Sequence, residues 1–221
     1  MKKIAILTAC IFLTIILSAQ TPEQSRKYQD NQSVEILKNL QKTLNAYTDI
    51  SIHFTFKTEK NDKFIDEVKG ITLIKKNKYT LETPQQKILC DGINLWNYLP
   101  EQKEVTVSLY NKEDDSQMMN PMNLINNYEK EYKPDFIKET SEKGILIQII
   151  DLTSLKATSF YKIRLILNKN KNQIMRFVVF DKDGTQYTYY IDKFLVNQAL
   201  TDSRFVFDIS KYPTTEIIDM R

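Results

Sequence analysis

The stretch that decides the fold is Leu89-Cys90-Asp91-Gly92-Ile93-Asn94-Leu95-Trp96-Asn97-Tyr98. It predicts a β-hairpin, because Asp-Gly between two apolar segments is a strong turn signal and Gly92 can take the positive φ of a type I′ turn. Side chains alternate along a strand, so Trp96 and Tyr98 share one face of the outgoing strand. The other face carries Leu95 and Asn97. A strand that is apolar on both faces must be covered on both, or must line a cavity on one.

A period of two continues over most of the chain. It begins where Ile50, Ile52, Phe54 and Phe56 alternate with polar residues. Further strands are predicted at 69–75, 78–83, 86–90, 95–99, 104–109, 144–152, 161–168, 173–181, 186–194 and 204–208. Asp183-Gly184 predicts a second hairpin turn. No strand–helix–strand rhythm is present, so the pattern favours one antiparallel sheet.

Two segments follow a helical period instead. Ser33 is a good N-cap, and the apolar residues after it recur at helical spacing, which predicts an amphipathic helix of about four turns. The segment 111–136 interrupts the sheet, and Asn120-Pro121 is a helix opening. The apolar, adaptable residues around this opening are Met118, Met119, Met122, Leu124 and Ile125. Such side chains suit core packing and a ligand-covering lid equally well.

The first residues have the layout of an export signal. Lys2 and Lys3 precede an apolar run at 4–17, and Leu17-Ser18-Ala19 offers a cleavage site before Gln20. The run is short for a bilayer span. Leu7-Thr8-Ala9-Cys10 resembles a lipobox, but most of the apolar run follows Cys10. We therefore expect a signal peptide at 1–19, cleaved after Ala19, and one exported, periplasmic, soluble domain at 20–221.

Removing the signal peptide changes the charge and the cysteine count. Without Lys2 and Lys3 the basic residues fall from 31 to 29, against 28 acidic residues. This near-neutral balance gives no argument for a nucleic-acid partner. Cys90 becomes the only thiol, so no intrachain disulfide is expected, and its place beside a turn indicates a small buried apolar residue.

The sequence contains little catalytic equipment. His53 is the one histidine, on the polar face of its strand, and no second His or neighbouring Cys could share a metal ion with it. The four glycines cannot form a phosphate-binding loop, and no nucleophile motif occurs. We therefore expect no metal, no cofactor and no catalytic residue. A carboxylate pair that meets only on folding stays open, as in a secreted hydrolase.

In the order of its blocks the chain resembles the periplasmic carriers of outer-membrane lipoproteins, the LolA family. The resemblance covers nearly all of the mature chain. It rests on these blocks: the helix ending at Tyr47, the strand at 51–58, Gly70-Ile71-Thr72-Leu73-Ile74-Lys75-Lys76, Asp91-Gly92 with Leu95-Trp96 and Tyr98-Leu99-Pro100, Asn120-Pro121-Met122, Ile150-Asp151-Leu152, Ile163-Arg164-Leu165, the pair around Asp183-Gly184, and Phe205-Val206-Phe207. The segment Asp-Gly-x-x-Leu-Trp-x-Tyr is the most specific of them.

The resemblance implies an unclosed antiparallel half-barrel of about eleven strands, lidded by α-helices and enclosing an apolar cavity. It implies a carrier, not an enzyme, that receives acylated lipoproteins from an inner-membrane ATP-driven release complex and delivers them to an outer-membrane acceptor. Strand alternation near the family blocks then predicts a cavity lined by Phe54, Phe56, Leu73, Tyr79, Leu81, Trp96, Tyr98, Phe177 and Val179. The predicted lid residues are Pro121, Met122, Leu124 and Ile125.

Two departures from the family bear on this interpretation. Many members carry Arg-Pro where this chain has Lys76-Asn77. Lys76 is therefore the possible latch that holds the lid: it keeps the positive charge of the Arg but lacks the planar guanidinium group with its five hydrogen-bond donors. The end also differs, since Phe207 is followed by Asp208-Ile209-Ser210 rather than by paired prolines and glycine. A lipid- or lipoprotein-sensing module of the same fold is the alternative function, with a carboxylate-based hydrolase behind it.

Overall fold

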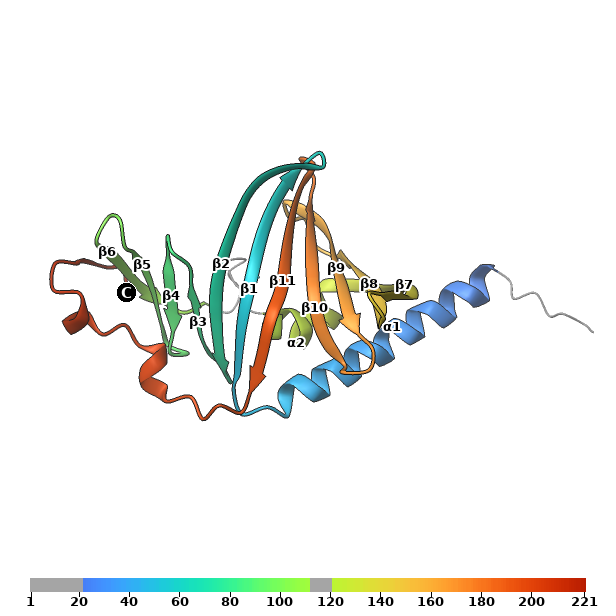
Figure 1. Ribbon diagram of the computed structural model, residues 1–221, viewed down its shortest axis with the longest axis horizontal. Helices are drawn as coiled ribbons and strands as arrows, with labels where there is room; N and C mark the ends of the chain where they lie inside the picture. Colours follow the sequence, from blue (N-terminus) through green and yellow to red (C-terminus); the bar gives the residue numbers. More distant parts are fainter. Residues whose placement is uncertain (1–21, 112–120) are drawn as a thin grey trace, which may run out of the picture.

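One twelve-stranded sheet dominates the computed structural model, which describes residues 22–111 and 121–221 (Figure 1). In chain order the elements are α1 (Pro22–Asn45), β1 (Ile50–Lys60), β2 (Lys63–Lys75), β3 (Lys78–Glu82), β4 (Lys87–Cys90), β5 (Asn94–Leu99), β6 (Glu104–Leu109), α2 (Pro121–Glu131), β7 (Tyr132–Glu142), β8 (Ile145–Ser154), β9 (Phe160–Asn168), β10 (Gln173–Asp181), β11 (Thr185–Val196), the 3₁₀ helices η2 (Asp202–Phe205) and η3 (Ile209–Lys211), and β12 (Glu216–Asp219). None of the described helices is long and apolar enough to cross a bilayer.

The sheet is open, as predicted. Its strand order is β12-β6-β5-β4-β3-β2-β1-β11-β10-β9-β8-β7, so β12 and β7 are its two edges. Neighbouring strands are antiparallel except β12, which pairs with β6 in parallel and departs from the purely antiparallel prediction. The strands curve around α1 and α2, which lie on the concave side (Figure 1). The architecture is a mainly β half-barrel with helices inside its opening.

The hairpin around Asp91-Gly92 forms with a different turn from the one predicted. Gly92 has φ +93°, whereas Ile93 has no positive φ, which is the pattern of a type II′ turn rather than type I′. The Asp91 carboxylate organises the turn, since its Oδ1 accepts hydrogen bonds from the N–H groups of Ile93 at 2.8 Å and Asn94 at 2.7 Å. The turn therefore requires Gly92 for its positive φ, and Asp91 for the carboxylate oxygen that accepts the two hydrogen bonds.

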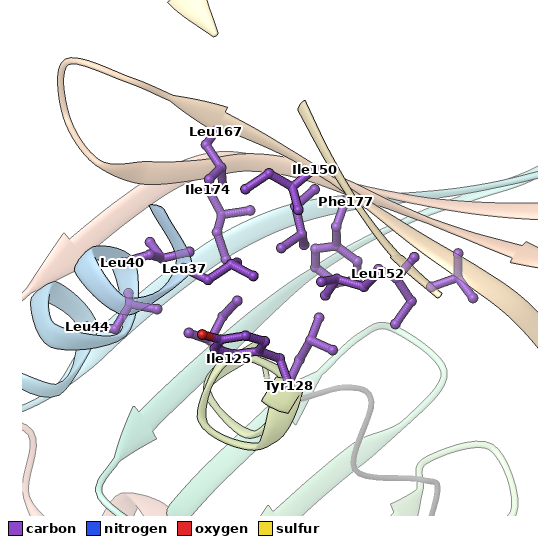
Figure 2. Packing of buried hydrophobic residues seen from close by; sticks show 14 of the residues in the cluster. Leu37, Leu40, Leu44, Ile125, Tyr128, Ile150, Leu152, Leu167, Ile174 and Phe177 are labelled. Carbon is purple, nitrogen blue, oxygen red and sulfur yellow. The ribbon is translucent and has the colours of Figure 1, made fainter. Parts of the chain in front are cut away.

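The main core lies between the concave face of the sheet and the two helices. Leu37, Leu40 and Leu44 reach it from α1, and Ile125 and Tyr128 from α2 (Figure 2). The sheet contributes residues that lie opposite one another on neighbouring strands. Ile50 on β1 lies opposite Ile74 on β2 and Val196 on β11, and all three pack in this core. Burial of this inner face therefore depends on both helices.

A second, smaller core lies on the outer face of β4–β6. Leu89, Tyr98 and Val105 are buried there, and Trp96 packs against them. The chain end covers them, because Phe207 and Tyr212 place their rings 5.3 and 4.7 Å from the ring of Tyr98. β12 then pairs with β6. The residues after β11 thus form a strap, residues 197–221, along the outside of the sheet.

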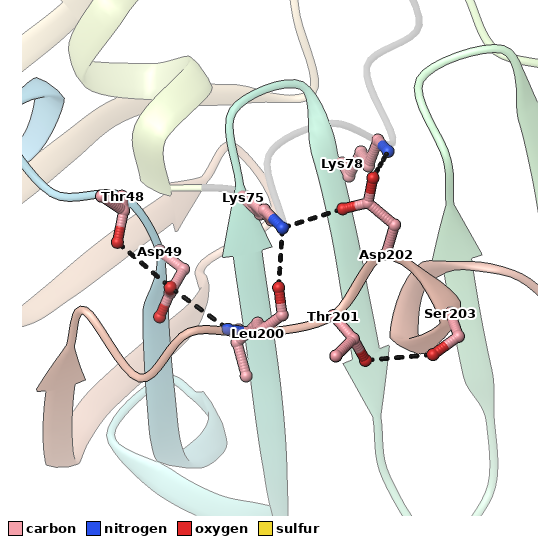
Figure 3. Close-up of polar contacts among 8 residues, drawn as sticks. All are labelled: Thr48, Asp49, Lys75, Lys78, Leu200, Thr201, Asp202 and Ser203. Carbon is pink, nitrogen blue, oxygen red and sulfur yellow. Dashed lines mark hydrogen bonds and ion pairs between the residues drawn. The ribbon is translucent and has the colours of Figure 1, made fainter.

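Charges attach the strap where it crosses β1–β3 (Figure 3). Asp202 accepts hydrogen bonds from Lys75 at 2.9 Å and Lys78 at 2.8 Å, and Lys75 also donates to the Leu200 carbonyl at 2.7 Å. The ion pairs with Lys78 and Lys75 lower the pKa of Asp202 to about 2. Buried Asp49 accepts from the N–H groups of Gln198 at 2.7 Å and Leu200 at 3.3 Å.

Several predicted elements need correction. The helix begins at Pro22 rather than at Ser33, and the first half of α1 is polar and has no apolar stripe that would mark it in the sequence. Ser33 is a buried residue within the helix, and its Oγ donates a hydrogen bond to the Asp30 carbonyl at 2.8 Å. The predicted strand at 204–208 is wrong, since η2 and the buried Phe205 occupy its first half. β7 begins inside the segment expected to interrupt the sheet, and β12 was not predicted.

The anchorage at Asp49 predicts a pH-dependent loss of stability. Burial alone would raise the pKa of Asp49, but the hydrogen bonds from Gln198, Leu200 and Thr48 hold it below its ordinary value. A lowered folded-state pKa adds stability above the unfolded pKa of about 3.9, and this stability is lost as the pH falls through the folded pKa. We expect Asp49→Asn to lose about 1–3 kcal/mol at pH 7, measured by urea unfolding, because its amide cannot satisfy both N–H donors.

The difference between wild type and Asp49→Asn should shrink at pH 3. Asp135→Asn is the control, because Asp135 is partly exposed on edge strand β7 and lies away from the strap. An equal loss at pH 7 and pH 3 would contradict an ionic role for Asp49.

Candidate ligand-binding site

Aromatic rings form the centre of the inner face. The ring of Tyr189 stacks on Phe177 at 4.5 Å between centroids and contacts Phe56 at 4.5 Å and Phe54 at 5.7 Å. Tyr187 stacks on Phe56 at 5.9 Å. β1, β10 and β11 position these side chains, because neighbouring antiparallel strands place opposite residues on one face. The result is a broad apolar surface with little shape specificity.

α2 covers part of this surface. Ile125 and Tyr128 are fully buried and Leu124 is nearly so. The polar contacts between α2 and α1 lie at the exposed rim of the helix pair. Asn45 Nδ2 donates to Asn126 Oδ1 at 3.1 Å, and Gln41 Nε2 lies 3.4 and 3.5 Å from the carbonyl oxygens of Ile125 and Asn126. Lys38 lies 3.9 Å from Glu129 with both side chains mostly exposed. Exposed ion pairs of this kind contribute little. α2 is therefore held mainly by apolar contacts.

Beside the end of α1 the inner face has little free volume. A cavity of about 10 Å³ is enclosed there by side chains including Leu44, Ile174 and Phe194, too small for an acyl chain. A ligand at this part of the inner face must therefore displace side chains or a helix. The sequence did not decide whether Leu124 and Ile125 belong to the core or to a lid. Their burial is consistent with both roles.

Six of the nine predicted lining residues lie on the inner face. They are Phe54, Phe56, Tyr79, Leu81, Phe177 and Val179, all in or against the main core. Ligand binding by these residues stays a prediction. Pro121 and Met122 open α2 as expected, but their side chains lie outside the described residues, as do Asn120, Met118 and Met119.

Leu73, Trp96 and Tyr98 lie on the other face, so the predicted inward orientation is wrong. Tyr98 and Trp96 belong to the second core under the strap. Leu73 lies opposite Thr80, whereas its neighbour Ile74 lies opposite Tyr79 of the main core. The pairing of residues along each strand was correct, but alternation does not say which face is concave, and the strap makes both faces apolar.

Some inner-face residues were missed. Cys90 is fully buried there, with Leu95 opposite it on β5, and burial raises the pKa of its thiol to about 11. The two-residue turn Lys76–Asn77 carried a usable signal. Such a turn pairs Lys75 with Lys78 and so places Ile74 and Tyr79 opposite each other on one face. Cys90 lies opposite Tyr79 on the next strand, and Leu95 lies opposite Cys90, so both share that face.

Lys76 lies in this turn with φ +56° and is exposed. Within the described residues no hydrogen bond or ion pair joins its ammonium group to another side chain, and its neighbours Lys75 and Lys78 hold the strap instead. A side-chain hydrogen bond between Tyr110, just after β6, and Asn123 of α2 does connect helix and sheet. A latch role for Lys76 stays a prediction.

Every buried side-chain nitrogen and oxygen within the described residues has a hydrogen-bond partner. Asp151 on β8 receives two hydrogen bonds from Arg164 on β9, at 2.7 and 2.9 Å, on the outer side of the sheet. No group of three or more His, Cys, Asp or Glu side chains within 22–111 and 121–221 could hold a metal ion. His53 is half-buried on the outer face, opposite Ile71 and Lys193. The inner face offers apolar contact rather than charge.

Comparison with known proteins gives a family and a fold. A family model described as "Outer membrane lipoprotein carrier protein LolA" matches residues 45–208. An uncharacterized conserved protein from Thermus thermophilus has a similar structure, with TM-score 0.58 and 13% identity over 85% of this chain and 99% of that chain. A DUF1329 family protein from Desulfovibrio piger gives 0.51 and 13%, over 83% and 99%. A LolA superfamily protein from Nitrosomonas europaea gives 0.44 and 15%, over 80% and 98%. No curated protein matches the chain.

The two faces predict different fluorescence responses. We expect the emission of Trp96 in the native sequence to be unchanged by a saturating acylated peptide, because Trp96 packs under the strap. In a Trp96→Phe background, Phe56→Trp should shift its emission with the same peptide, since Phe56 contacts the inner-face rings. A shift from Trp96 with none from position 56 would contradict this placement.

Proposed function

The chain belongs to the LolA family of outer-membrane lipoprotein carriers, and we propose that it carries lipoproteins through the periplasm by holding their acyl chains against its inner face. The observation that carries this proposal is the apolar inner face, which α2 covers mainly through the buried apolar side chains Leu124, Ile125 and Tyr128. A surface of this kind can exchange one apolar cover for another. No bond is made or broken in such transport, so no catalytic residue is required.

The magnitudes make this exchange feasible. Burying Leu124 and Ile125 is worth roughly 3–6 kcal/mol together. Acyl burial is worth about 0.8 kcal/mol per methylene, so about four to eight methylene groups match the two side chains. An acyl chain of more than eight methylene groups therefore more than offsets the loss of these two side-chain contacts, without an external energy source at the carrier. The returning helix opposes binding, which keeps net affinity low enough for release to a membrane.

The proposal includes the route of the cargo. Residues 1–19 direct export and are removed after Ala19, leaving the carrier in the periplasm. An inner-membrane ATP-driven release complex supplies acylated lipoproteins, and an outer-membrane acceptor receives them. The near balance of charge in the mature chain suits a protein that moves between surfaces without adhering to an anionic one.

Weakening the cover tests the proposal. We expect Leu124→Ala with Ile125→Ala to bind an acylated peptide about tenfold more tightly or better, because helix closure then competes less with the ligand. Release to acceptor vesicles should slow accordingly. Equilibrium binding by the shift of Phe56→Trp emission in the Trp96→Phe background measures the affinity.

Ile217→Ala with Ile218→Ala is the matched control. It removes similar apolar area from the exposed edge strand β12, away from the inner face, and should leave affinity unchanged. Unchanged affinity in the α2 variant together with lower thermal stability would show that α2 is ordinary core.

A further inference from the structure

The wall of the half-barrel has a step beside β2. β2 is 13 residues long and β3 only 5, and they pair only from Ile71 to Lys75. The first part of β2, residues 63–70, has β1 on one side and, within 22–111 and 121–221, no strand on the other. Figure 1 shows β2 extending well beyond β3. This part of β2 is called the free edge below.

Backbone groups of the free edge point toward the open side. The two-residue turn makes Lys75 and Lys78 a hydrogen-bonded pair, so Ile71, Leu73 and Lys75 direct their peptide groups to β3. By alternation Glu67 and Lys69 direct theirs to the open side. In agreement, the Glu67 N–H donates to the Asp66 side chain at 2.8 Å instead of to β1.

A groove of about 610 Å³ lies at the step. Its walls come from the outer face and from the end of β3: His53, Lys69, Ile71, Glu82, Thr83, Pro84, Asp192 and Lys193. Phe54 and Gly70 also line it, although Phe54 belongs to the inner-face core. The groove on the outside of the wall therefore borders Phe54, whose side chain belongs to the inner-face core.

Gly70 and Phe54 pack closely against each other at the step. A Cβ on Gly70 would lie 2.4 Å from Cζ of Phe54 and 2.6 Å from the Glu82 carbonyl oxygen, so the Phe54 ring fills the space that a side chain would need. Phe54 is otherwise held by ring contact with Tyr189. Phe54 is thus the residue that the groove and the inner-face core share.

We propose that the groove and the free edge hold the extended polypeptide that follows the acyl chains of a cargo protein, while the acyl chains pass Phe54 to the inner face. This inference rests on the proposed carrier function. Peptide groups lose several kcal/mol of hydration if buried unpaired, so the polypeptide must leave the apolar interior close to the acylated residue. A free strand edge gives such a chain backbone partners without regard to its sequence.

The charges at the groove suit a polypeptide of variable sequence. Lys69 and Lys193 stand beside Glu82 and Asp192, so neither sign dominates. Asp192 also accepts a hydrogen bond from Thr55 at 2.7 Å, and Glu82 lies 3.2 Å from Lys87. A groove for one anionic head group would show an excess of cations, which this one lacks.

Two probes with the same acyl chain test the inference: a palmitoylated peptide of extended sequence, and palmitoyl amide, which has no polypeptide. We expect wild type to bind the palmitoylated peptide about tenfold more tightly than the amide. Methylating the peptide nitrogens of the probe should abolish that advantage. Lys69→Pro should abolish it too, because proline removes an N–H from the free edge, while leaving affinity for the amide unchanged.

Ile137→Pro is the matched control. Ile137 is the exposed bulge residue of the other edge strand, β7, so its proline removes an N–H far from the groove and should preserve the tenfold advantage. Equal wild-type affinity for the two probes, or an advantage that survives both N-methylation and Lys69→Pro, would overturn the inference while leaving the carrier function intact. If neither probe binds, the carrier function fails as well.

Discussion

The structure depends on one constraint: a sheet whose edges do not meet cannot bury its own concave face. β7 and β12 end the sheet at opposite sides, and the inner face between them carries buried side chains from nearly every strand. Those side chains must be covered by something apolar. In this state α1 and α2 supply the cover, through buried side chains such as Leu37, Ile125 and Tyr128.

The two faces of the sheet are covered by different physical means. The outer face of β4–β6 is covered by the strap, which is fixed by Asp49, by the ion pairs of Asp202 and by stacking of Phe207 and Tyr212 on Tyr98. These contacts are directional and specific to the strap. At the inner face, α2 relies chiefly on Leu124, Ile125 and Tyr128, whose burial is non-directional. Under the proposed function, an acyl chain replaces the second kind of cover but not the first.

Strand alternation and turn residues predicted most of the fold. The hairpins at Asp91-Gly92 and Asp183-Gly184 and the unclosed half-barrel follow from local pattern and from the family blocks. The inward orientation of Trp96 and Tyr98 could not be predicted, because it depends on Phe207 and Tyr212, more than a hundred residues away along the chain. The start of α1 was missed for a related reason, since its first half carries no apolar period to mark it.

The free edge of β2 raises the question of why copies of the chain would not join there. It carries charges of both signs, at Lys63, Asp66, Glu67 and Lys69, and the Asp66 carboxylate already accepts a hydrogen bond from the Glu67 N–H. Such features discourage pairing between molecules in free solution. A polypeptide tethered by its own acyl chain is in a different position, because the tether raises its effective concentration at the edge to the millimolar range or above. Weak strand addition is then sufficient for cargo and still too weak for self-association.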